Sequence, residues 1–325
     1  MLACGHGCAD LAQGAVPALL PFFVHQRGYS YAATSALVLA MTITSSLIQP
    51  LFGHLADRRS LPLLLPGGVL LAGLGTALAG VTSTYPLTFL SVAVAGIGVG
   101  AYHPEAARYA NYVSGRQRAT GMSLFSVGGN VGFALGPILV TPLVLILGLT
   151  GTLWLLVVFG AITALVAATL PHLLSFRPDR TGSANAARKP EGEDRWGAFS
   201  LVAAVAAFRS GAYFGLQAFV PAYFIAHFGA STSVGNTALT VLLASGALGT
   251  LTGGRLADRI GRRPVLVGCM AVLTPLILVV LVAGEIGGII LLGAVGFFTI
   301  GNFSITVVLG QEYLPNRIGI AAGVT

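Results

Sequence analysis

Charge is the scarcest property of this sequence. Asp, Glu, Lys and Arg together make up 8% of the 325 residues, whereas 55% are hydrophobic, and the mean hydropathy is +0.86. Soluble domains carry about a quarter charged residues. A water-soluble chain of this size could not cover its surface with so few charges, so the composition excludes a soluble protein and predicts an integral membrane protein with many spans.

Lysine and cysteine are nearly absent. Only one of the 17 basic residues is a lysine, and the arginines stand in short clusters between apolar runs. That pattern is typical of cytoplasmic loops rather than of a basic binding face, so we expect no nucleic-acid partner despite the net charge of +7. Three cysteines provide no disulfide framework, and we expect no separate cleavable signal, because the first apolar run begins at the start methionine.

Apolar runs of about 20 residues, long enough to cross a bilayer, follow one another along the chain. We predict an all-α membrane protein with ten full spans and the start of an eleventh near Ile318. The expected spans are 3–25, 33–56, 62–82, 86–110, 119–145, 150–172, 198–227, 234–257, 264–284 and 286–311.

The chain also repeats itself. "FGHLADRR" at 52–59 matches "GGRLADRI" at 253–260 with an offset of 201, and the polar stretch after residue 176 separates six spans from the remainder. Two homologous six-helix halves are the architecture of a secondary transporter that rocks around a central site. We therefore expect an N-terminal half at 1–176, a cytoplasmic linker at 177–196 and an incomplete C-terminal half at 197–325. On this repeat we expect the chain to be a fragment, or a truncated gene product, of a protein of about 390–400 residues.

Arginine placement predicts the orientation. Nearly all the arginines lie on one side of the membrane if the spans alternate; Arg27, on the other side, and Arg209, inside the seventh span, are the exceptions. The positive-inside rule then places the N-terminus, the linker and the loop after span eight in the cytoplasm of an inner or plasma membrane.

The two repeated loops carry a family resemblance. "GGRLADRIGRRP" resembles the signature loop of the major facilitator superfamily, roughly G-x-L-a-D-r-x-G-r-k, whereas the first copy loses the later glycine and basic pair. In span five, Gly132, Gly136 and Pro137 resemble the core of the superfamily's antiporter motif without its trailing Gly-Gly. Glycines let helices pack closely, and Pro137, like Pro104 in span four, loosens its helix.

A closer resemblance covers essentially the whole chain. "GVGAYHPEAARYANYVSG", the following "RATGMSLFSVGGNVGFALGP" and the early H-x3-D-x2-Q (His6, Asp10, Gln13) are similar to the fosmidomycin-resistance branch of efflux permeases. The resemblance implies twelve helices and proton-driven export. It leaves the cargo open.

Ionisable residues inside a bilayer cost about 2.5–3.5 kcal/mol each, so they indicate function by default. The repeat serves as a control for those in the first half: Asp10, His103, Glu105 and Arg108 correspond to Gly211, Ser304, Thr306 and Leu309. Helix packing in the second half manages without these charges. We therefore expect the first-half residues to serve function.

Proton coupling by Asp10, Glu105 and His103 is our hypothesis for that function. A carboxyl group or a histidine in a low-dielectric site can take up and release a proton near neutral pH. The alternative is a static cluster, in which Glu105 and Arg108, three residues apart on a helix, form a plain ion pair.

Arg209 stands alone in span seven. Its guanidinium presents a fork of donors that suits a carboxylate or phosphonate, which favours an anionic cargo or a pairing with Asp10. The alternative is an arginine at the cytoplasmic end of the span that reaches the headgroups.

The repeated loops are predicted to form a cytoplasmic gate. Asp57 would face the N-terminus of the eleventh helix, and Asp258 that of the fifth helix near Arg118, where a helix dipole favours an anion. The alternative is that these charges only determine topology. The expected gate residues are Gly53, Asp57, Arg58, Arg108, Gly254, Asp258, Arg259, Gly261 and Arg262.

The segment "CGHGCAD" at 4–10 resembles a set of metal ligands. On a helix, however, Cys4 and Cys8 share one face, while His6 and Asp10 point nearly the opposite way. Four ligands on opposite sides of one helix cannot close around a tetrahedral metal. We therefore expect no metal here and interpret His6, Asp10 and Gln13 as a polar stripe facing a cavity.

These features predict a monomeric transporter, not an enzyme, that exports small toxic compounds, with a proton gradient and no cofactor as its energy source. Its partners would be the small-molecule cargo and the lipid bilayer. A symporter that imports a nutrient such as an organic acid, and a non-transporting membrane sensor or enzyme, remain alternatives. The repeat with two gate loops argues against the latter.

Overall fold

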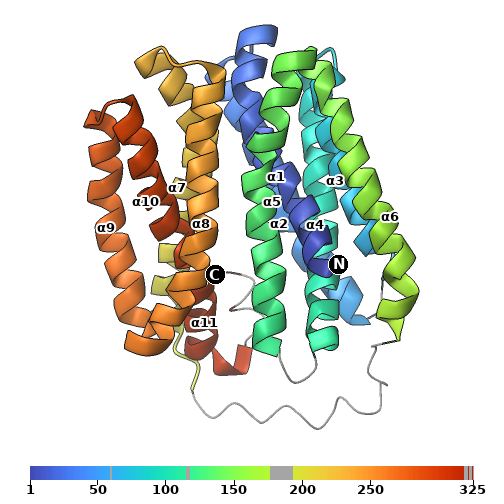
Figure 1. The fold of residues 1–325 in the computed structure, drawn as a ribbon. Helices are drawn as coiled ribbons and strands as arrows, with labels where there is room; N and C mark the ends of the chain where they lie inside the picture. The colour runs from blue at the N-terminus through green and yellow to red at the C-terminus, as the bar shows by residue number, and fades with distance from the viewer. Residues whose placement is uncertain (59–60, 115–117, 176–192, 318–320, 322–323, 325) are drawn as a thin grey trace. The chain divides into compact units, whose positions relative to one another are not determined.

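The computed structural model describes residues 1–58, 61–114, 118–175, 193–317, 321 and 324 (Figure 1). Within these ranges nearly every residue is helical and no strand occurs. The side chains at 54, 56–58, 111, 118–120, 123 and 304 are also outside the description. The chain divides into two compact units, Met1–Arg177 with Ala218–Thr240, and Pro178–Gln217 with Val241–Thr325.

Apolar composition and length determine the helices. The helices up to residue 174 are α1 (Leu2–Arg27), α2 (Tyr31–Arg58), α3 (Leu64–Val81), α4 (Tyr85–Ser114), α5 (Arg118–Leu147), the 3-10 helix η1 (Gly148–Trp154) and α6 (Leu155–Leu174). Those that follow are α7 (Trp196–Phe228), α8 (Thr232–Ile260), α9 (Arg262–Val282), α10 (Glu285–Gly301), α11 (Phe303–Tyr313) and the 3-10 turn η3 (Pro315–Arg317).

Nine segments of the described chain are long and apolar enough to cross a membrane. One of them, Leu124–Leu174, has 51 residues and contains both α5 and α6. At about 1.5 Å per residue it is more than twice as long as a bilayer core is thick, so it crosses twice. The ten crossings predicted from the apolar runs therefore each have a helical counterpart, with bounds shifted by a few residues.

The tenth predicted span differs from the structure. The apolar run 286–311 predicts one helix, but α10 ends at Gly301 and α11 begins at Phe303. Asn302 between them is buried with φ −99° and ψ 4°, and its side-chain amide donates to the carbonyl of Phe298 at 2.7 Å. An asparagine side chain that bonds the backbone competes with helical hydrogen bonds, and this interrupts the helix. The eleventh span predicted near Ile318 begins outside the described residues.

The sequence repeat extends to helix packing. A Cβ added to Gly96 in α4 would meet the backbone carbonyl of Met41 in α2, and one added to Gly296 in α10 would meet that of Leu242 in α8. Met41 and Leu242 are 201 residues apart, the same offset as the repeated loops, whereas the two glycines are 200 residues apart. A glycine therefore brings the fourth helix of each repeat against the second.

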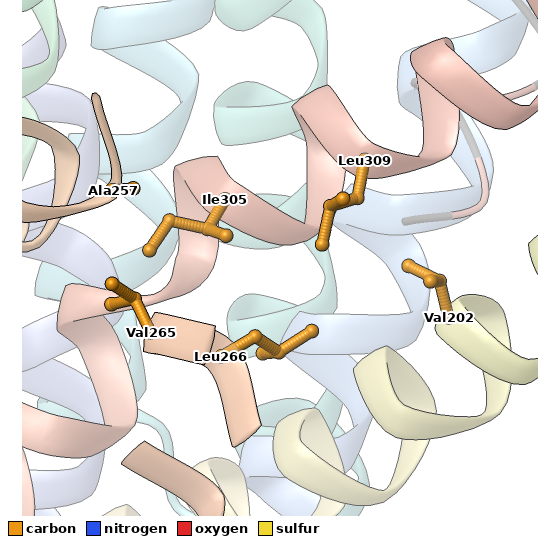
Figure 2. Packing of buried hydrophobic residues seen from close by; sticks show 6 residues of the cluster. All are labelled: Val202, Ala257, Val265, Leu266, Ile305 and Leu309. Carbon is orange, nitrogen blue, oxygen red and sulfur yellow. The ribbon is translucent and has the colours of Figure 1, made fainter. Parts of the chain in front are cut away.

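An apolar cluster holds α11 within the second unit (Figure 2). It joins side chains from α7, α8, α9 and α11: Val202, Ala257, Val265, Leu266, Ile305 and Leu309. Gly261, in the turn that separates α8 from α9, has φ 98°, a conformation that side chains with a Cβ rarely adopt. This glycine explains the sharp turn within the second copy of the signature loop.

Candidate functional site

The segment "CGHGCAD" forms the first turns of α1, and its polar stripe is inside the protein. His6 and Asp10 are buried, with 8% and 4% of their surface exposed. Gln13, one turn further, donates from Nε2 to Asp10 Oδ1 at 2.9 Å. Cys4 is exposed and Cys8 is buried. The predicted face of His6, Asp10 and Gln13 is thus present and internally hydrogen-bonded.

Helix α4 brings His103 to this stripe. His103 Nε2 lies 3.2 Å from Asp10 Oδ1 and 3.1 Å from His6 Nε2, and His6 Nε2 lies 3.1 Å from Asp10 Oδ2. We refer to these three residues as the His–Asp–His cluster. The two helices supply residues 97 positions apart in sequence.

Backbone carbonyls determine which nitrogen of each ring donates. His6 Nδ1 lies 2.7 Å from the carbonyl oxygen of Phe125, and His103 Nδ1 lies 2.8 Å from that of Val99. A carbonyl oxygen can only accept, so both Nδ1 atoms carry hydrogen and donate. In a neutral imidazole the other nitrogen then has no hydrogen. Both Nε2 atoms therefore present lone pairs.

The consequence is a convergence of electron-rich atoms. Two imidazole nitrogens and a carboxylate lie 3.1–3.2 Å apart, and in a buried site their mutual repulsion is weakly screened. A cation among them, either a proton or a metal ion, would remove this repulsion. The geometry of the cluster therefore directs three acceptor groups at one point.

Helix α5 completes the walls of the cluster. The Phe125 ring stacks on His6 with centroids 4.0 Å apart and planes inclined by 15°. A Cβ added to Gly129 would lie 2.5 Å from Asp10 Oδ2 and 2.6 Å from His6 Cε1, closer than real Cβ contacts allow. The absence of a side chain at Gly129 is what makes room for the two functional side chains.

The antiporter-like glycines pack α5 against α1. A Cβ on Gly132 would meet the carbonyl group of Gly7, and one on Gly136 would meet the backbone of Gly14. Both contacts are backbone to backbone, so they leave no room for any side chain. Pro137 follows within the same helix. These contacts are of the kind that the sequence analysis expects of Gly132 and Gly136.

Glu105 is engaged elsewhere on α4. It is fully buried, its Oε1 accepts from Arg108 Nη2 at 2.7 Å, and the backbone N–H of Leu61 donates to the same oxygen at 3.2 Å. Residues two apart on a helix point about 200° apart, so Glu105 and His103 face different neighbours. The ion pair considered as the alternative for Glu105 and Arg108 is present, and it joins α4 to the loop before α3. Pro104 lies between the two faces, inside α4.

Arg209 is buried in the second unit, with 5% of its surface exposed. Its Nη1 donates to Asn302 Oδ1 at 3.2 Å and to Thr306 Oγ1 at 3.1 Å, and its guanidinium lies 4.8 Å from the centroid of the Phe303 ring. Within the described ranges no carboxylate lies within 4.0 Å of it. Arg209 is thus an interior cation held by neutral partners, and its burial contradicts the alternative in which it reaches the headgroups.

The structure describes some of the predicted gate residues of the first loop and leaves the side chains of others outside its description. Gly53 lies on α2, where a Cβ would be 3.8 Å from Pro104 of α4. The side chains of Asp57 and Arg58, and that of Arg118, lie outside the described residues. The gate contacts proposed for Asp57 and Asp258 therefore stay predictions.

The second loop is described in full. Gly254, Asp258 and Arg259 occupy the last turns of α8, and both charged side chains belong to exposed residues. After Gly261, Arg262 forms an ion pair with Glu312 near the end of α11. This contact connects the loop with the last helix of its own unit.

Some residues of structural importance escaped the sequence analysis. Arg27, the exception on the outer side, donates to the carbonyls of Ala79 and Gly80 at 3.0 and 2.5 Å and to Thr88 Oγ1 at 2.9 Å. Its hydrogen bonds therefore connect α1 with α3 and α4. Asn302 was also missed, although its repeat counterpart, Ala101, marks it as a polar replacement in an apolar run.

The fold is that of a multi-pass helical membrane protein, and comparison with known sequences gives its family. The sequence model of the Major Facilitator Superfamily matches residues 2–325, so the chain belongs to this superfamily.

Curated relatives and solved structures are consistent with this assignment. The chain is 29% identical over 330 residues to the uncharacterized MFS-type transporter YfnC of Bacillus subtilis, covering 98% of this chain and 80% of that protein. It is 27% identical to the fosmidomycin resistance protein of Escherichia coli, covering 98% and 79%.

Two solved structures show the shared fold. A bacterial homolog of the human lysosomal transporter Spinster, in an inward-facing unoccupied conformation, matches with a TM-score of 0.77 at 16% identity over 99% of this chain and 77% of that one. The D-xylose-proton symporter matches with a TM-score of 0.68 at 17% identity, covering 99% and 85%.

Proposed function

We propose that this protein is a proton-coupled antiporter that exports small toxic, antibiotic-like compounds by alternating access. Support for export comes from the fosmidomycin resistance protein at 27% identity and from the α1–α5 glycine contact at the antiporter-like motif. Support for proton coupling comes from the His–Asp–His cluster, and this cluster is the observation on which the proposal depends.

The cluster suits proton transfer because its three lone pairs need a cation. A proton on either Nε2 would be shared with the neighbouring nitrogen and with Asp10, to which Gln13 donates a hydrogen bond at 2.9 Å. The His103 side chain is 22% exposed, which gives protons a route to a site that is otherwise closed. Glu105, ion-paired with Arg108, is assigned to holding α4 and the neighbouring loop in place.

Arg209 supports an anionic cargo such as a phosphonate. Its Nη1 is hydrogen-bonded to neutral side chains, and its Nη2 lies 3.5 Å from Ser210 Oγ. A buried guanidinium with neutral partners retains its full charge and can pair with an anionic cargo that enters the protein.

The remaining assignments follow from the sequence patterns. We propose that the N-terminus and the central linker are cytoplasmic, that the two LADR loops close the cytoplasmic side, and that the protein works as a monomer in an inner or plasma membrane. The proton gradient supplies the energy, so the proposal includes no cofactor.

The test is transport by the full-length protein reconstituted in vesicles. We expect an imposed pH gradient to drive phosphonate antibiotic efflux, an uncoupler to abolish it, and Asp10→Asn to reduce gradient-driven transport roughly 100-fold, the scale of a lost proton-transfer group. Glu285→Gln, an acidic residue at the start of α10, is the matched control and should transport normally. Full gradient-driven transport by Asp10→Asn would overturn the proton-site assignment.

Counterflow distinguishes the alternatives. Substrate exchange without a gradient should survive in Asp10→Asn, because alternating access does not need the proton site. Accumulation driven by an inward proton gradient would instead identify a symporter that imports its substrate. No substrate-dependent exchange by the wild-type protein would favour a non-transporting sensor or enzyme.

A further inference from the structure

We infer that the His–Asp–His cluster is also a binding site for a divalent transition-metal ion of the Zn²⁺ class. His6, Asp10 and His103 each offer one ligand atom, and these atoms all lie within 4.8 Å of one another. The inference depends on the geometry of α1 and α4 alone, whatever the cargo or direction of transport.

The two rings and the carboxylate lie close enough together to share one metal ion. Zinc bonds to nitrogen and oxygen are about 2.0–2.1 Å long, which places neighbouring tetrahedral ligands about 3.3–3.4 Å apart. The observed separations are 3.1 Å between the two Nε2 atoms, 3.1 Å from His6 Nε2 to Asp10 Oδ2 and 3.2 Å from His103 Nε2 to Asp10 Oδ1, so each ring faces a different oxygen of the carboxylate. An ion held by both Nε2 atoms can therefore bind Asp10 through either carboxylate oxygen or through both.

The surroundings resemble the outer shell of a metal site. A ligating histidine nearly always donates its other ring N–H to a carbonyl or carboxylate, which fixes the ring. Here His6 donates to Phe125 and His103 to Val99 through their backbone carbonyls, and Gln13 donates to the Asp10 carboxylate. Both rings are thereby locked with Nε2 directed at the centre.

The donor set determines the class of ion. Two imidazoles and one carboxylate suit Zn²⁺, Co²⁺, Ni²⁺ and Fe²⁺, whereas Mg²⁺ and Ca²⁺ prefer oxygen ligands only. Three protein ligands leave a fourth tetrahedral position for water. The partial exposure of His103 gives an ion access to the cluster.

The sequence argument against a metal considered one helix only. It correctly separates Cys4 and Cys8 from His6 and Asp10, but the third ligand comes from α4, which the segment "CGHGCAD" cannot reveal. The inferred site therefore uses two residues of that segment and neither cysteine.

The experiment is Co²⁺ titration of the full-length protein in detergent, purified with an affinity tag free of histidine. Co²⁺ replaces Zn²⁺ and gives visible absorption bands that report tetrahedral nitrogen and oxygen ligands. We expect about one ion per chain, displaced by Zn²⁺ but not by Mg²⁺, and an affinity at least about 100-fold lower in His6→Gln and His103→Gln. His25→Gln, an exposed histidine at the other end of α1, should bind as the wild type does.

A third variant keeps the test decisive if a glutamine variant does not fold. In His103→Cys a thiolate replaces the imidazole, so the ion should remain bound and new sulfur-to-cobalt bands should appear. Unchanged bands in His103→Cys, wild-type affinity in His103→Gln, or no stoichiometric Co²⁺ uptake by the wild type would each overturn the inference. Transport is not measured here, so failure of the metal site leaves the antiporter proposal to its own test.

Discussion

Helix α4 and its repeat counterpart, the α10–α11 pair, pack against the second helix of their repeat in a similar way but carry different polar side chains. Both press a glycine, Gly96 or Gly296, against the second helix of their repeat. Beyond that contact α4 continues unbroken to Ser114 and carries His103, Glu105 and Arg108, whereas the counterpart breaks at Asn302. The glycine contact is common to both repeats and serves helix packing. The ionisable residues at these three positions occur on α4 alone of the two, and we interpret them as functional.

In the second repeat, the residues that correspond to Glu105 and Arg108 have different packing roles. Thr306, which corresponds to Glu105, accepts a hydrogen bond from Arg209, and Leu309, which corresponds to Arg108, lies in the apolar cluster of Figure 2. In each unit an arginine therefore contacts the side chain at this repeat position, Glu105 or Thr306. In the first unit the cation is paired with a carboxylate, and in the second it has neutral partners.

The largest expected effect comes from breaking the ion pair of α4. Arg108→Leu removes the cation that lies 2.7 Å from the fully buried Glu105, and this should lower the free energy of unfolding by about 3–5 kcal/mol. The double variant Glu105→Thr/Arg108→Leu copies the residues of the second repeat and should recover most of that loss. Denaturant unfolding in detergent measures both, and a double variant as unstable as the single one would contradict the comparison.

A smaller loss is expected at the helix break. Asn302→Ala removes an acceptor of Arg209 Nη1, and a hydrogen bond to a charged group contributes about 1.5–3 kcal/mol. Asn302→Asp keeps the acceptor and adds an opposite charge but loses the donor to the Phe298 carbonyl, so as the comparison variant it should be more stable than Asn302→Ala. The same unfolding measurement applies, and equal stability of Asn302→Ala and wild type would show that Arg209 does not need this partner.

The sequence predicts where helices lie and which residues share a helix face better than it predicts contacts between helices. Helical periodicity places His6, Asp10 and Gln13 on one face, and hydropathy locates the spans within a few residues. Whether His103 reaches that face depends on how α1, α4 and α5 cross, which small contacts at Gly129 and Gly132 determine. Such contacts join residues about a hundred positions apart and leave no local pattern.

The shared glycine contact can be tested in both repeats at once. Gly96→Ala and Gly296→Ala each place a Cβ against a backbone carbonyl and should destabilise the protein by about 1–3 kcal/mol, to a similar extent. Gly268→Ala, on α9, is the control because no atom lies within 4 Å of its added Cβ. Thermal unfolding followed by size-exclusion chromatography gives the comparison. A large loss in only one repeat would mean that the two scaffolds are not equivalent.

The smallest effect is expected at the surface pair of the second loop. Arg262 and Glu312 are ion-paired, but their side chains are 37% and 46% exposed, so solvent and salt screen the attraction. Arg262→Ala should therefore cost only about 0.2–1 kcal/mol, and high salt should remove the difference from wild type. A loss as large as that of Arg108→Leu would show that the loop stabilises the folded state itself. A small loss of stability with a large loss of transport would instead indicate that Arg262 acts in the gating transition, as its place in the signature loop predicts.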